Sequence, residues 1–423
     1  MFALDCKKTA NLSCIASYEF VEQEYSIEVL KDLKNNSLDN ILEQKNKLQF
    51  FMKSGLSDMY RNAKSLCYPE IPHNQRNRAG QKLKELFDAF PELHNYNSFF
   101  DICGGPGAWS MYLLSSGEKR GHGITLTTPE LCRQWYDEIL EDYGDRFTIV
   151  DYDTNDICMP NIRDHIKCLY EVSQEKFNLV VADGAPPDDS YSDENLQELY
   201  AFPIICAEAA IALQILDEKG NFILKILDSY TDATKSLLYL ITYCFKQVFI
   251  FKPPSSRQVN SEKYVICIGY KRKIGEKTAL PQLQKSLDKM QNGKIVQSIL
   301  PSSIYTLDTK FKKTYEELDK NFGAKQLEAL SKVINLMNDW IANKDKGKGI
   351  DQCKGDRKGG KHKGKSVKGG KDFEKGKGKG KFGKCNYNNF ESSDGWKGGW
   401  GKGTWQEWGK GSWGKGWDVG APY

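Results

Sequence analysis

Residues 98–110 read Ser98-Phe99-Phe100-Asp101-Ile102-Cys103-Gly104-Gly105-Pro106-Gly107-Ala108-Trp109-Ser110. The run 98–102 predicts a short buried strand, and a glycine-rich turn and a helical pattern follow it. Glycine has no Cβ, so a ligand can approach the backbone closely at such a turn. Ligands of open α/β sheets bind outside the carboxyl ends of the strands. We therefore expect a nucleotide-like cofactor to contact Cys103, Gly104, Gly105, Pro106, Gly107, Ala108 and Trp109.

The spacing of these glycines differs from that of dinucleotide-binding folds, which use G-x-G-x-x-G and an acid about 20 residues further on. Here the turn is G-G-P-G, and the next predicted strand ends at 124–126 without an acid. We expect the partner of the ribose or base elsewhere. Asp151, Asp153 and Asp156, with Ile157, follow the third predicted strand. Three nearby aspartates are also typical of a solvated turn, so both interpretations stay open.

Strand and helix patterns alternate from residue 61 to residue 275. Such alternation predicts an α/β fold with a mostly parallel sheet. The last two predicted strands are joined by a loop without a helix, which allows an antiparallel edge strand. The seven predicted strands are Ser98–Ile102, Gly121–Leu126, Arg146–Val150, Phe177–Ala182, Asn221–Ile226, Gln247–Phe251 and Lys263–Gly269.

Opposite charges end two neighbouring predicted strands. Asp183 follows the apolar run 177–182, and Lys225 ends the run 220–225. The carboxyl ends of parallel strands meet at one edge of a sheet, so these side chains would form a charged cleft. A structural ion pair at the rim of the sheet is the simpler alternative.

Two further segments complete a recognisable pattern. Arg78-Ala79-Gly80-Gln81-Lys82-Leu83 opens a helix, although a lone lysine such as Lys82 is normally exposed. The polar loop Lys252–Tyr264 contains Glu262 just before the last predicted strand. Together the segments resemble the FtsJ/RrmJ 2′-O-ribose methyltransferases, whose catalytic tetrad is Lys-Asp-Lys-Glu in chain order. The resemblance assigns that tetrad to Lys82, Asp183, Lys225 and Glu262.

Within that family the sequence most resembles the cap-specific mRNA enzymes, through residues 194–198 and 252–264. This resemblance implies a Rossmann-like fold, S-adenosylmethionine as cofactor, no required metal, and capped mRNA with N7-methylguanosine as substrate. The implied reaction methylates the ribose 2′-hydroxyl of a cap-proximal nucleotide, of the cap-0 to cap-1 type. The implied RNA contacts are Asn195, Leu196, Gln197, Arg257 and Asn260, with the basic residues Arg61 and Lys64 as further candidates.

The reaction needs help with one proton, because a ribose hydroxyl is a poor nucleophile at neutral pH. The enzyme must align an in-line attack and ease removal of that proton. We expect Lys225, in its neutral form, to act as the general base. Lys82 and burial would lower the pKa of Lys225, whereas Asp183 and Glu262 would raise it, and the sequence leaves the balance open.

Two other functions are compatible with parts of the sequence. A ribosomal RNA 2′-O-methyltransferase would share the fold, but residues 194–198 and 252–264 favour the cap enzymes. A non-catalytic RNA-binding protein with this fold would have no physical need for the four tetrad residues together.

Charge is distributed unevenly along the 423 residues. From Lys344 onward there are 20 Lys/Arg and 9 Asp/Glu, so the rest of the chain is acidic although the total is +4. This segment alternates lysine with glycine and holds six of the nine tryptophans. It has too little aliphatic surface to fold, so we predict a disordered tail. Its charges and indoles suit non-specific RNA binding, and a solubilising tail is the alternative.

The expected organisation is a helical extension over 1–60, a methyltransferase domain over 61–275, a helical region over 276–343 and the tail over 344–423. Two sets of apolar residues at helical spacing support the prediction that the regions on either side of the methyltransferase domain are helical. The first predicts short amphipathic helices, and the second predicts a helix packed against the catalytic body. These sets are Ile27, Leu30, Leu33, Ile41 and Leu42, and Leu327, Leu330, Ile334, Met337 and Ile341.

The 12 cysteines include no C-x-x-C pair, which argues against a structural zinc site or a disulfide scaffold. No apolar run approaches about 18 residues, so we expect no membrane span. We therefore expect a soluble intracellular protein that acts beside the capping or transcription machinery. Its location would be the nucleus if it is cellular, and the cytoplasm or a viral factory if it is viral.

Overall fold

The computed structural model describes residues 1–4, 6, 22–23, 36–127, 135–186, 194–291 and 294–345. All of them belong to one compact unit, Met1–Ile350, and the second unit, Asp351–Tyr423, lies outside the described residues. The prediction of a disordered tail therefore falls outside the described residues, apart from its first two positions. The same holds for Ile27, Leu30 and Leu33 of the N-terminal extension.

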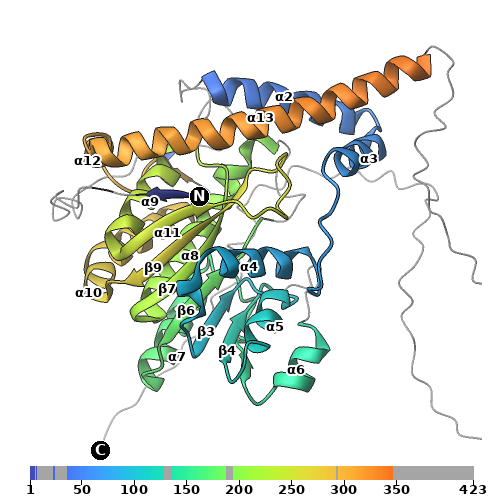
Figure 1. The fold of residues 1–423 in the computed structure, drawn as a ribbon. Coiled ribbons are helices and arrows are strands. Elements are labelled where there is room, and N and C mark those ends of the chain that lie inside the picture. The colour runs from blue at the N-terminus through green and yellow to red at the C-terminus, as the bar shows by residue number, and fades with distance from the viewer. Residues whose placement is uncertain are drawn as a thin grey trace, which may run out of the picture. The chain divides into compact units, whose positions relative to one another are not determined.

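A mixed eight-stranded sheet forms the centre of the unit (Figure 1), in the order β1-β8-β9-β7-β6-β3-β4-β5. Strands β5, β4, β3, β6 and β7 are parallel to their neighbours in that series. Strand β9 is antiparallel to both β7 and β8, and β1 is antiparallel to β8. The bounds are β1 Phe2–Leu4, β3 Ser98–Ile102, β4 Arg120–Ile124, β5 Phe147–Ile149, β6 Phe177–Ala182, β7 Leu216–Leu227, β8 Phe245–Phe251 and β9 Glu262–Tyr270.

The α/β fold with a mostly parallel sheet is confirmed, and each of the seven expected strands is present. Two details differ from the prediction. The antiparallel strand β9 is not at the edge, because it lies between β7 and β8. An eighth strand, β1, forms that edge instead, since its three residues pair with Val248–Ile250.

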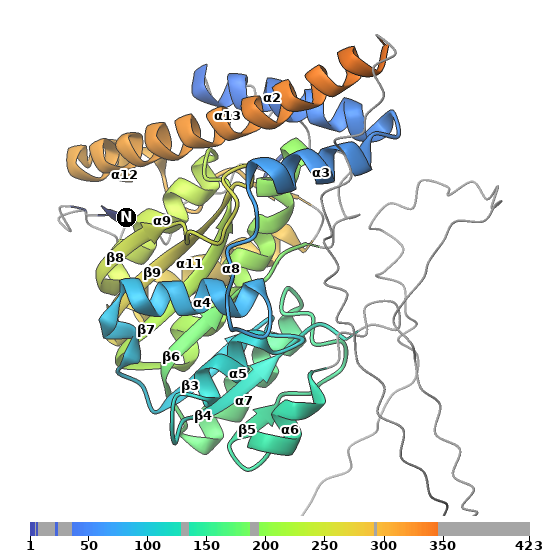
Figure 2. The ribbon, with the colours of Figure 1, turned by 45° about the vertical axis from the view of Figure 1, so that its right-hand side comes forward.

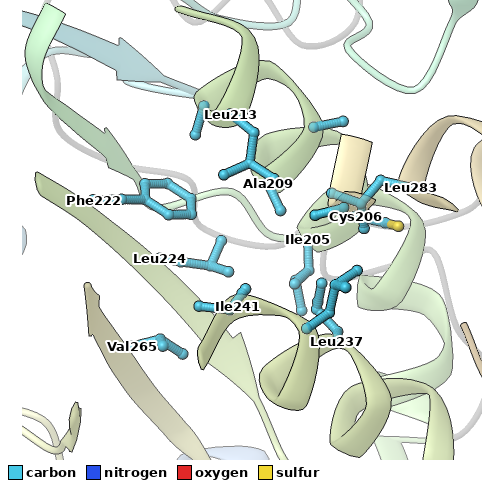
Figure 3. Packing of buried hydrophobic residues seen from close by; sticks show 14 of the residues in the cluster. Ile205, Cys206, Ala209, Leu213, Phe222, Leu224, Leu237, Ile241, Val265 and Leu283 are labelled. Carbon is cyan, nitrogen blue, oxygen red and sulfur yellow. The ribbon is translucent and has the colours of Figure 1, made fainter. Parts of the chain in front are cut away.

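Helices cover both faces of the sheet and bury two apolar clusters. On one face, α4, α5 and α6 pack against strand residues such as Phe99 and Ile223. On the other face, α7, α8, α9 and α11 pack against residues such as Phe222, Leu224 and Val265 (Figure 3). The bounds are α4 Arg78–Ala89, α5 Ala108–Leu114, α6 Asp137–Tyr143, α7 Pro160–Ser173, α8 Gln197–Ile215, α9 Asp232–Cys244, α10 Arg272–Ile274, α11 Leu280–Met290 and α12 Ser302–Thr306.

A further layer of helices lies across one end of this body (Figures 1 and 2). It consists of α2 (Asn36–Lys53), α3 (Ser57–Cys67) and the long helix α13 (Thr309–Asp345). Leu330, Ile334 and Met337 of α13 are buried together with Ile41 of α2, in a cluster that also includes Tyr230 of the body. The predicted apolar face of α13 therefore packs on the N-terminal helices as well as on residues of the body such as Tyr230.

Helix α8 is long and apolar enough to cross a membrane by length and composition. However, 83% of its most apolar window is buried inside the unit. Helix α8 therefore has the burial of a core helix, packed between the sheet and α11 (Figure 3).

Candidate active site

The turn after β3 forms one wall of a pocket of about 340 Å³ at the carboxyl ends of the parallel strands. This volume lies in the range of about 300–1,000 Å³ that is usual for small-molecule sites. Gly107, one of the predicted cofactor residues, does not line the pocket; its φ of 106° places it in the left-handed region at the start of α5. The predicted cofactor residues that do line it are Cys103, Gly104, Gly105, Pro106, Ala108, Trp109, Asp156, Ile157 and Asp183.

The glycines of the turn allow it to pack tightly against its own supporting strands. A Cβ on Gly105 would lie 2.6 Å from Thr125 Oγ1, and a Cβ on Gly104 would lie 2.5 Å from Asp101 Cγ. Both contacts are too close for a real side chain. The added atom would meet protein at both positions, so the glycines have a packing role besides the ligand approach predicted from the sequence.

The loop after β5 contributes one of its three aspartates to the pocket. Asp156 lines the pocket, and its Oδ1 accepts a hydrogen bond of 2.9 Å from the backbone N–H of Cys158. Asp151 and Asp153 are exposed and do not line it. Of the three candidates, only Asp156 is therefore placed to contact a ligand in this pocket.

The chemistry of the pocket suits S-adenosylmethionine, a cation with an amino-acid end and an adenosine end. Asp101 is fully buried and accepts 2.7 Å from Ser110 Oγ, while its Oδ1 has no hydrogen-bond partner within the described residues. Burial raises the pKa of Asp101 to about 7, and a cationic ligand nearby would favour its ionised form. Among the described residues, no group of three or more His, Cys, Asp or Glu side chains is placed to hold a metal ion.

Parallel pairing of β6 with β7 brings together Asp183 and Lys225, two of the four residues assigned to the tetrad. Ala182 of β6 is opposite Leu224 of β7, so Asp183 and Lys225 follow at the same level of the sheet. Lys225 Nζ lies 3.1 Å from Asp183 Oδ1 and also donates to the backbone carbonyl of Asp183. Both residues line the pocket, as the strand-end argument predicted.

Antiparallel pairing brings the glutamate to the same place. Lys225 of β7 is opposite Tyr264 of β9, and Leu227 is opposite Glu262. Alternate residues of a strand share a face, so Lys225, Tyr264 and Glu262 lie on one side of the sheet. Glu262 could not be placed there from the sequence, because that requires β9 to insert beside β7.

Helix α4 lies across that face and supplies the remaining lysine (Figure 2). Its apolar side, with Leu83, Leu86 and Phe87, is buried on the sheet. Lys82 Nζ reaches Glu262 with 2.6 Å to Oε1 and 2.8 Å to Oε2. The predicted surface environment of a lone lysine does not apply to Lys82, since only 12% of its side chain is exposed.

A tyrosine connects the two ion pairs of the tetrad. Tyr264 Oη lies 3.1 Å from Asp183 Oδ1 and 2.8 Å from Glu262 Oε1. The single phenol proton can be donated to one of the two carboxylates at a time, so Lys225, Asp183, Tyr264, Glu262 and Lys82 form one continuous row of close polar contacts. Tyr264 was not singled out from the sequence, although the alternation Glu262-Lys263-Tyr264 could have shown that it shares a strand face with Glu262.

The charges of this chain shift each other's pKa values. Burial alone would lower the pKa of Lys225, but the carboxylates of Asp183 and Glu262 outweigh it, so the pKa is raised. Burial would raise the pKa of Glu262, but Lys82 and Lys225 hold it below its usual range. Burial, reinforced by both carboxylates, raises the pKa of Tyr264. These shifts favour the cation of Lys225 and the carboxylate of Glu262 at neutral pH.

Glu208 is a second residue that the sequence analysis did not single out, and it supports the tetrad through the backbone. Glu208 of α8 is fully buried, and its Oε1 accepts 2.8 Å from the backbone N–H of Gly184. Burial raises the pKa of Glu208 to about 8. Glu208 thereby fixes the backbone next to Asp183. Its position as an acid inside the apolar run 201–215 was the available signal.

The predicted RNA-contacting residues lie in three places. Asn195 and Leu196 are buried, and Asn195 Nδ2 donates 2.6 Å to Asn46 Oδ1 of α2. Gln197 begins α8 and accepts from Ser261 Oγ. Arg257 and Asn260 lie in the loop between β8 and β9, where Asn260 is exposed.

The basic residues Arg61 and Lys64 lie on α3. Arg61 is exposed and pairs with Asp58 one turn away on the same helix. Lys64 Nζ lies 4.7 Å from the centroid of the Tyr60 ring. Neither residue lines the pocket.

A family model described as FtsJ-like methyltransferase matches residues 75–270. The chain is similar to the cap-specific mRNA (nucleoside-2′-O-)-methyltransferase 1 of Trypanosoma cruzi, at 31% identity over 278 residues, which cover 61% of this chain and 74% of that protein. It is similar to the cap-specific mRNA (nucleoside-2′-O-)-methyltransferase of Autographa californica nuclear polyhedrosis virus, at 29% identity over 303 residues, 70% of this chain and 99% of that protein. The chain therefore belongs to the FtsJ-like methyltransferase family.

Proposed function

We propose that this protein transfers a methyl group from S-adenosylmethionine to the ribose 2′-hydroxyl of a cap-proximal nucleotide in capped mRNA. The observation that carries the proposal is the placement of Asp183 and Lys225 on the pocket wall, joined through Tyr264 to Glu262 and Lys82. The choice of capped mRNA is supported by the names of the similar proteins.

S-adenosylmethionine supplies a methyl group that is already activated by the positive charge on sulfur. The protein has to hold that cofactor and present an oxygen nucleophile to it. In our proposal, Asp156 and Ile157 hold the adenosine end. The turn over Gly104 and Gly105, with Asp101 beneath it, holds the amino-acid end.

Lys225 is the residue that we assign to the ribose hydroxyl. Its amine takes the hydroxyl proton, Asp183 fixes the position of Nζ, and the ion pair of Lys82 with Glu262 holds the opposite side. Because the pKa of Lys225 is raised in the free protein, the neutral amine is scarce at pH 7. The methylation rate should therefore rise with pH across the neutral range and beyond.

The loop between β8 and β9 and the start of α8 are the proposed RNA contacts. Arg257 contributes a cation, and Asn260 contributes an exposed amide, on the strand end next to the tetrad. Gln197 is tied to the same loop through Ser261. These groups would hold the first nucleotides of the transcript over Lys225.

Labelled methyl transfer to short capped RNA, with nuclease mapping of the product, tests the proposal. Lys225→Arg keeps the positive charge but cannot accept a proton in this pH range. It should lower the single-turnover rate by a factor of about 100 or more. Lys235→Arg is the matched control, because Lys235 on the next helix, α9, pairs only with Asp232 at 3.3 Å among the interactions described and should leave the rate unchanged.

Three results would contradict the proposal. Equal methylation of capped and uncapped RNA would show that the cap is not recognised as part of the substrate. A product methylated on a base would show that the ribose is not the methyl acceptor. A near-normal rate for Lys225→Arg, with an unchanged pH profile, would show that the proton leaves by a route that does not involve Lys225.

A further inference from the structure

One lysine outside the tetrad is placed at the centre of the loop that leads into Glu262. Lys252 follows β8 directly, and its Nζ donates 3.1 Å to Ser256 Oγ, 2.8 Å to Asn260 O and 2.8 Å to Glu262 O. The three acceptors are four, eight and ten residues further along the chain. Lys252 therefore closes the whole segment 253–262 around a single nitrogen.

The number of acceptors matches the ammonium form of lysine. An ammonium has three N–H donors and no lone pair, whereas a neutral amine has two donors and one lone pair. Two of the acceptors, on Asn260 and Glu262, are backbone carbonyls, which can only accept. Only the ammonium can donate to all three oxygens at once; the neutral amine would keep the third contact only by accepting from the Ser256 hydroxyl.

A second anchor fixes the outer side of the same loop. Glu85 of α4 accepts 2.9 Å from both the backbone N–H and the hydroxyl of Ser255. Ser255 and Ser256 are buried, so this part of the loop is held against the body. Arg257 and Asn260 follow this anchored part. Lys252 holds this second half of the loop together with the hydrogen bonds of Ser261 to Gln197 and of Gln326 to the carbonyl of Val259.

We infer that Lys252 is a positioning residue for methyl transfer, because its ammonium holds Arg257 and Asn260 in place for RNA and fixes the backbone of Glu262. This inference rests on the proposed function for the role of RNA. The closed form of the loop itself does not depend on the identity of the substrate.

The surroundings of Lys252 make this loop sensitive to pH. Burial lowers the pKa of Lys252 to about 7; the charges of Lys263 and Lys82 act in the same direction, and those of Glu262 and Asp228 oppose them. Because the folded pKa is lowered, the ammonium is present below about pH 7 and is lost as pH rises through that value. The neutral amine has only two N–H donors, so its bonds to the carbonyls of Asn260 and Glu262 lose their charge assistance, and the contact with Ser256 persists only if that hydroxyl reverses and donates to the amine.

Two measurements on the wild-type protein follow from this. Amide hydrogen exchange of residues 253–261, corrected for the intrinsic effect of pH, should speed up about tenfold between pH 6 and pH 9, the expected effect of replacing charge-assisted hydrogen bonds by weaker neutral ones. Over the same range the KM for capped RNA should rise by a similar factor. The affinity for S-adenosylmethionine should stay constant, since Lys252 does not line the cofactor pocket.

The variant Lys252→Met removes the donors while keeping most of the side chain's length. Its KM for capped RNA should be about tenfold higher than wild type at pH 6.5 and should no longer change with pH. Its kcat at saturating RNA should change much less. The control Lys246→Met, at an exposed position of the same strand, should match wild type.

Unchanged loop exchange between pH 6 and pH 9 in the wild-type protein would overturn the inference, and this result does not require the variant to fold. A KM for Lys252→Met with the same pH dependence as wild type would overturn it as well. A pH-dependent loop without any methylation of capped RNA would instead contradict the proposed substrate, and would leave the role of Lys252 in the loop intact.

Discussion

Tyr264 places one phenol oxygen between two carboxylates of the candidate active site, at 3.1 Å from Asp183 Oδ1 and 2.8 Å from Glu262 Oε1. The phenol can donate its one proton to either carboxylate, so removing the oxygen should loosen whichever carboxylate accepts it without emptying the space that the ring fills. We predict that Tyr264→Phe lowers the single-turnover methylation rate by about tenfold, equivalent to the loss of about one hydrogen bond to a charged group. Cofactor affinity, measured by calorimetry, should not change.

Tyr270→Phe is the matched control for that variant. Tyr270 lies on the same strand and is equally buried, but its hydroxyl donates to Leu213 O, away from the tetrad. It should cost about 1 kcal/mol of stability and no activity. Equal rates for Tyr264→Phe and wild type would show that the ion pairs hold the carboxylates without the phenol.

Gly105 gives a second prediction at the scale of the residue. A Cβ there would lie 2.6 Å from Thr125 Oγ1 and 2.8 Å from Thr125 Cγ2. We predict that Gly105→Ala weakens binding of S-adenosylmethionine because the turn has to move away from β4. Adding Thr125→Ala should restore most of the affinity, since it removes the two atoms that clash.

Calorimetric titration of the wild type, Gly105→Ala and the double variant distinguishes two reasons for this glycine. If the added methyl group blocked the ligand itself, Thr125→Ala would not rescue binding. A rescue would show that the glycine is required for packing between the turn and the strand.

The four tetrad residues were not equally predictable. Asp183 and Lys225 follow apolar runs, so the rule that parallel strands end at one edge predicted that they meet. Lys82 and Glu262 came from family resemblance alone. Their proximity depends on how α4 lies on the sheet and on which strand β9 pairs with, and neither is visible in local sequence patterns. Tyr264 and Lys252 were missed because their role lies in contacts between segments.

At the scale of elements, the N-terminal helix α2 is joined by an ion pair to the end of β7, the strand that carries Lys225. Lys45 Nζ lies 3.0 Å from Asp228 Oδ2, and the two side chains are only 10% and 3% exposed. Asp228 has a φ of 61° and lies just after the end of β7. Since removal of one partner leaves a buried charge, Lys45→Met should cost about 3 kcal/mol of unfolding free energy, measured by urea titration.

Lys47 provides the control on the same helix. It pairs with Glu43 at 2.7 Å, but the two side chains are 46% and 60% exposed. Lys47→Met should change stability by less than about 0.5 kcal/mol. A small effect for Lys45→Met as well would mean that water solvates Asp228 once the lysine is replaced.

Helices and strands were predicted well where the local sequence alone determines them. They were predicted poorly where pairing with a distant segment determines them. The strands from 98 to 269 carry apolar runs bounded by polar turns, so their existence followed from the sequence. Strand β1 has three residues, too few for any pattern, and exists because β8 offers an open edge. The interior place of β9 and the partner of α13 also depend on contacts with distant segments.

At the scale of the whole molecule, residues 1–350 and residues 351–423 differ in net charge. Residues 351–423 hold 17 Lys/Arg and 8 Asp/Glu, while residues 1–350 hold 43 and 48. We predict that deletion of 351–423 weakens RNA binding. The deletion should also reduce the slope of log K against log salt, by about 0.7 for each phosphate of single-stranded RNA that this region neutralises. Turnover on saturating short capped RNA should be unchanged. Identical slopes for both proteins would rule out RNA binding by this region.

The place of β9 in the sheet also has a consequence for how the enzyme is made. The strands that bear the glycine turn, Asp183 and Lys225 are all synthesised before β9, and β8 precedes it too. In the finished sheet β9 lies between β7 and β8, so the centre of the sheet is incomplete until residues 262–270 have been made. Domains generally fold as units. A nascent chain therefore has the strands that carry the glycine turn, Asp183 and Lys225 before it has Glu262 and Tyr264, and it can assemble all four residues of the proposed tetrad only after this last strand has been made.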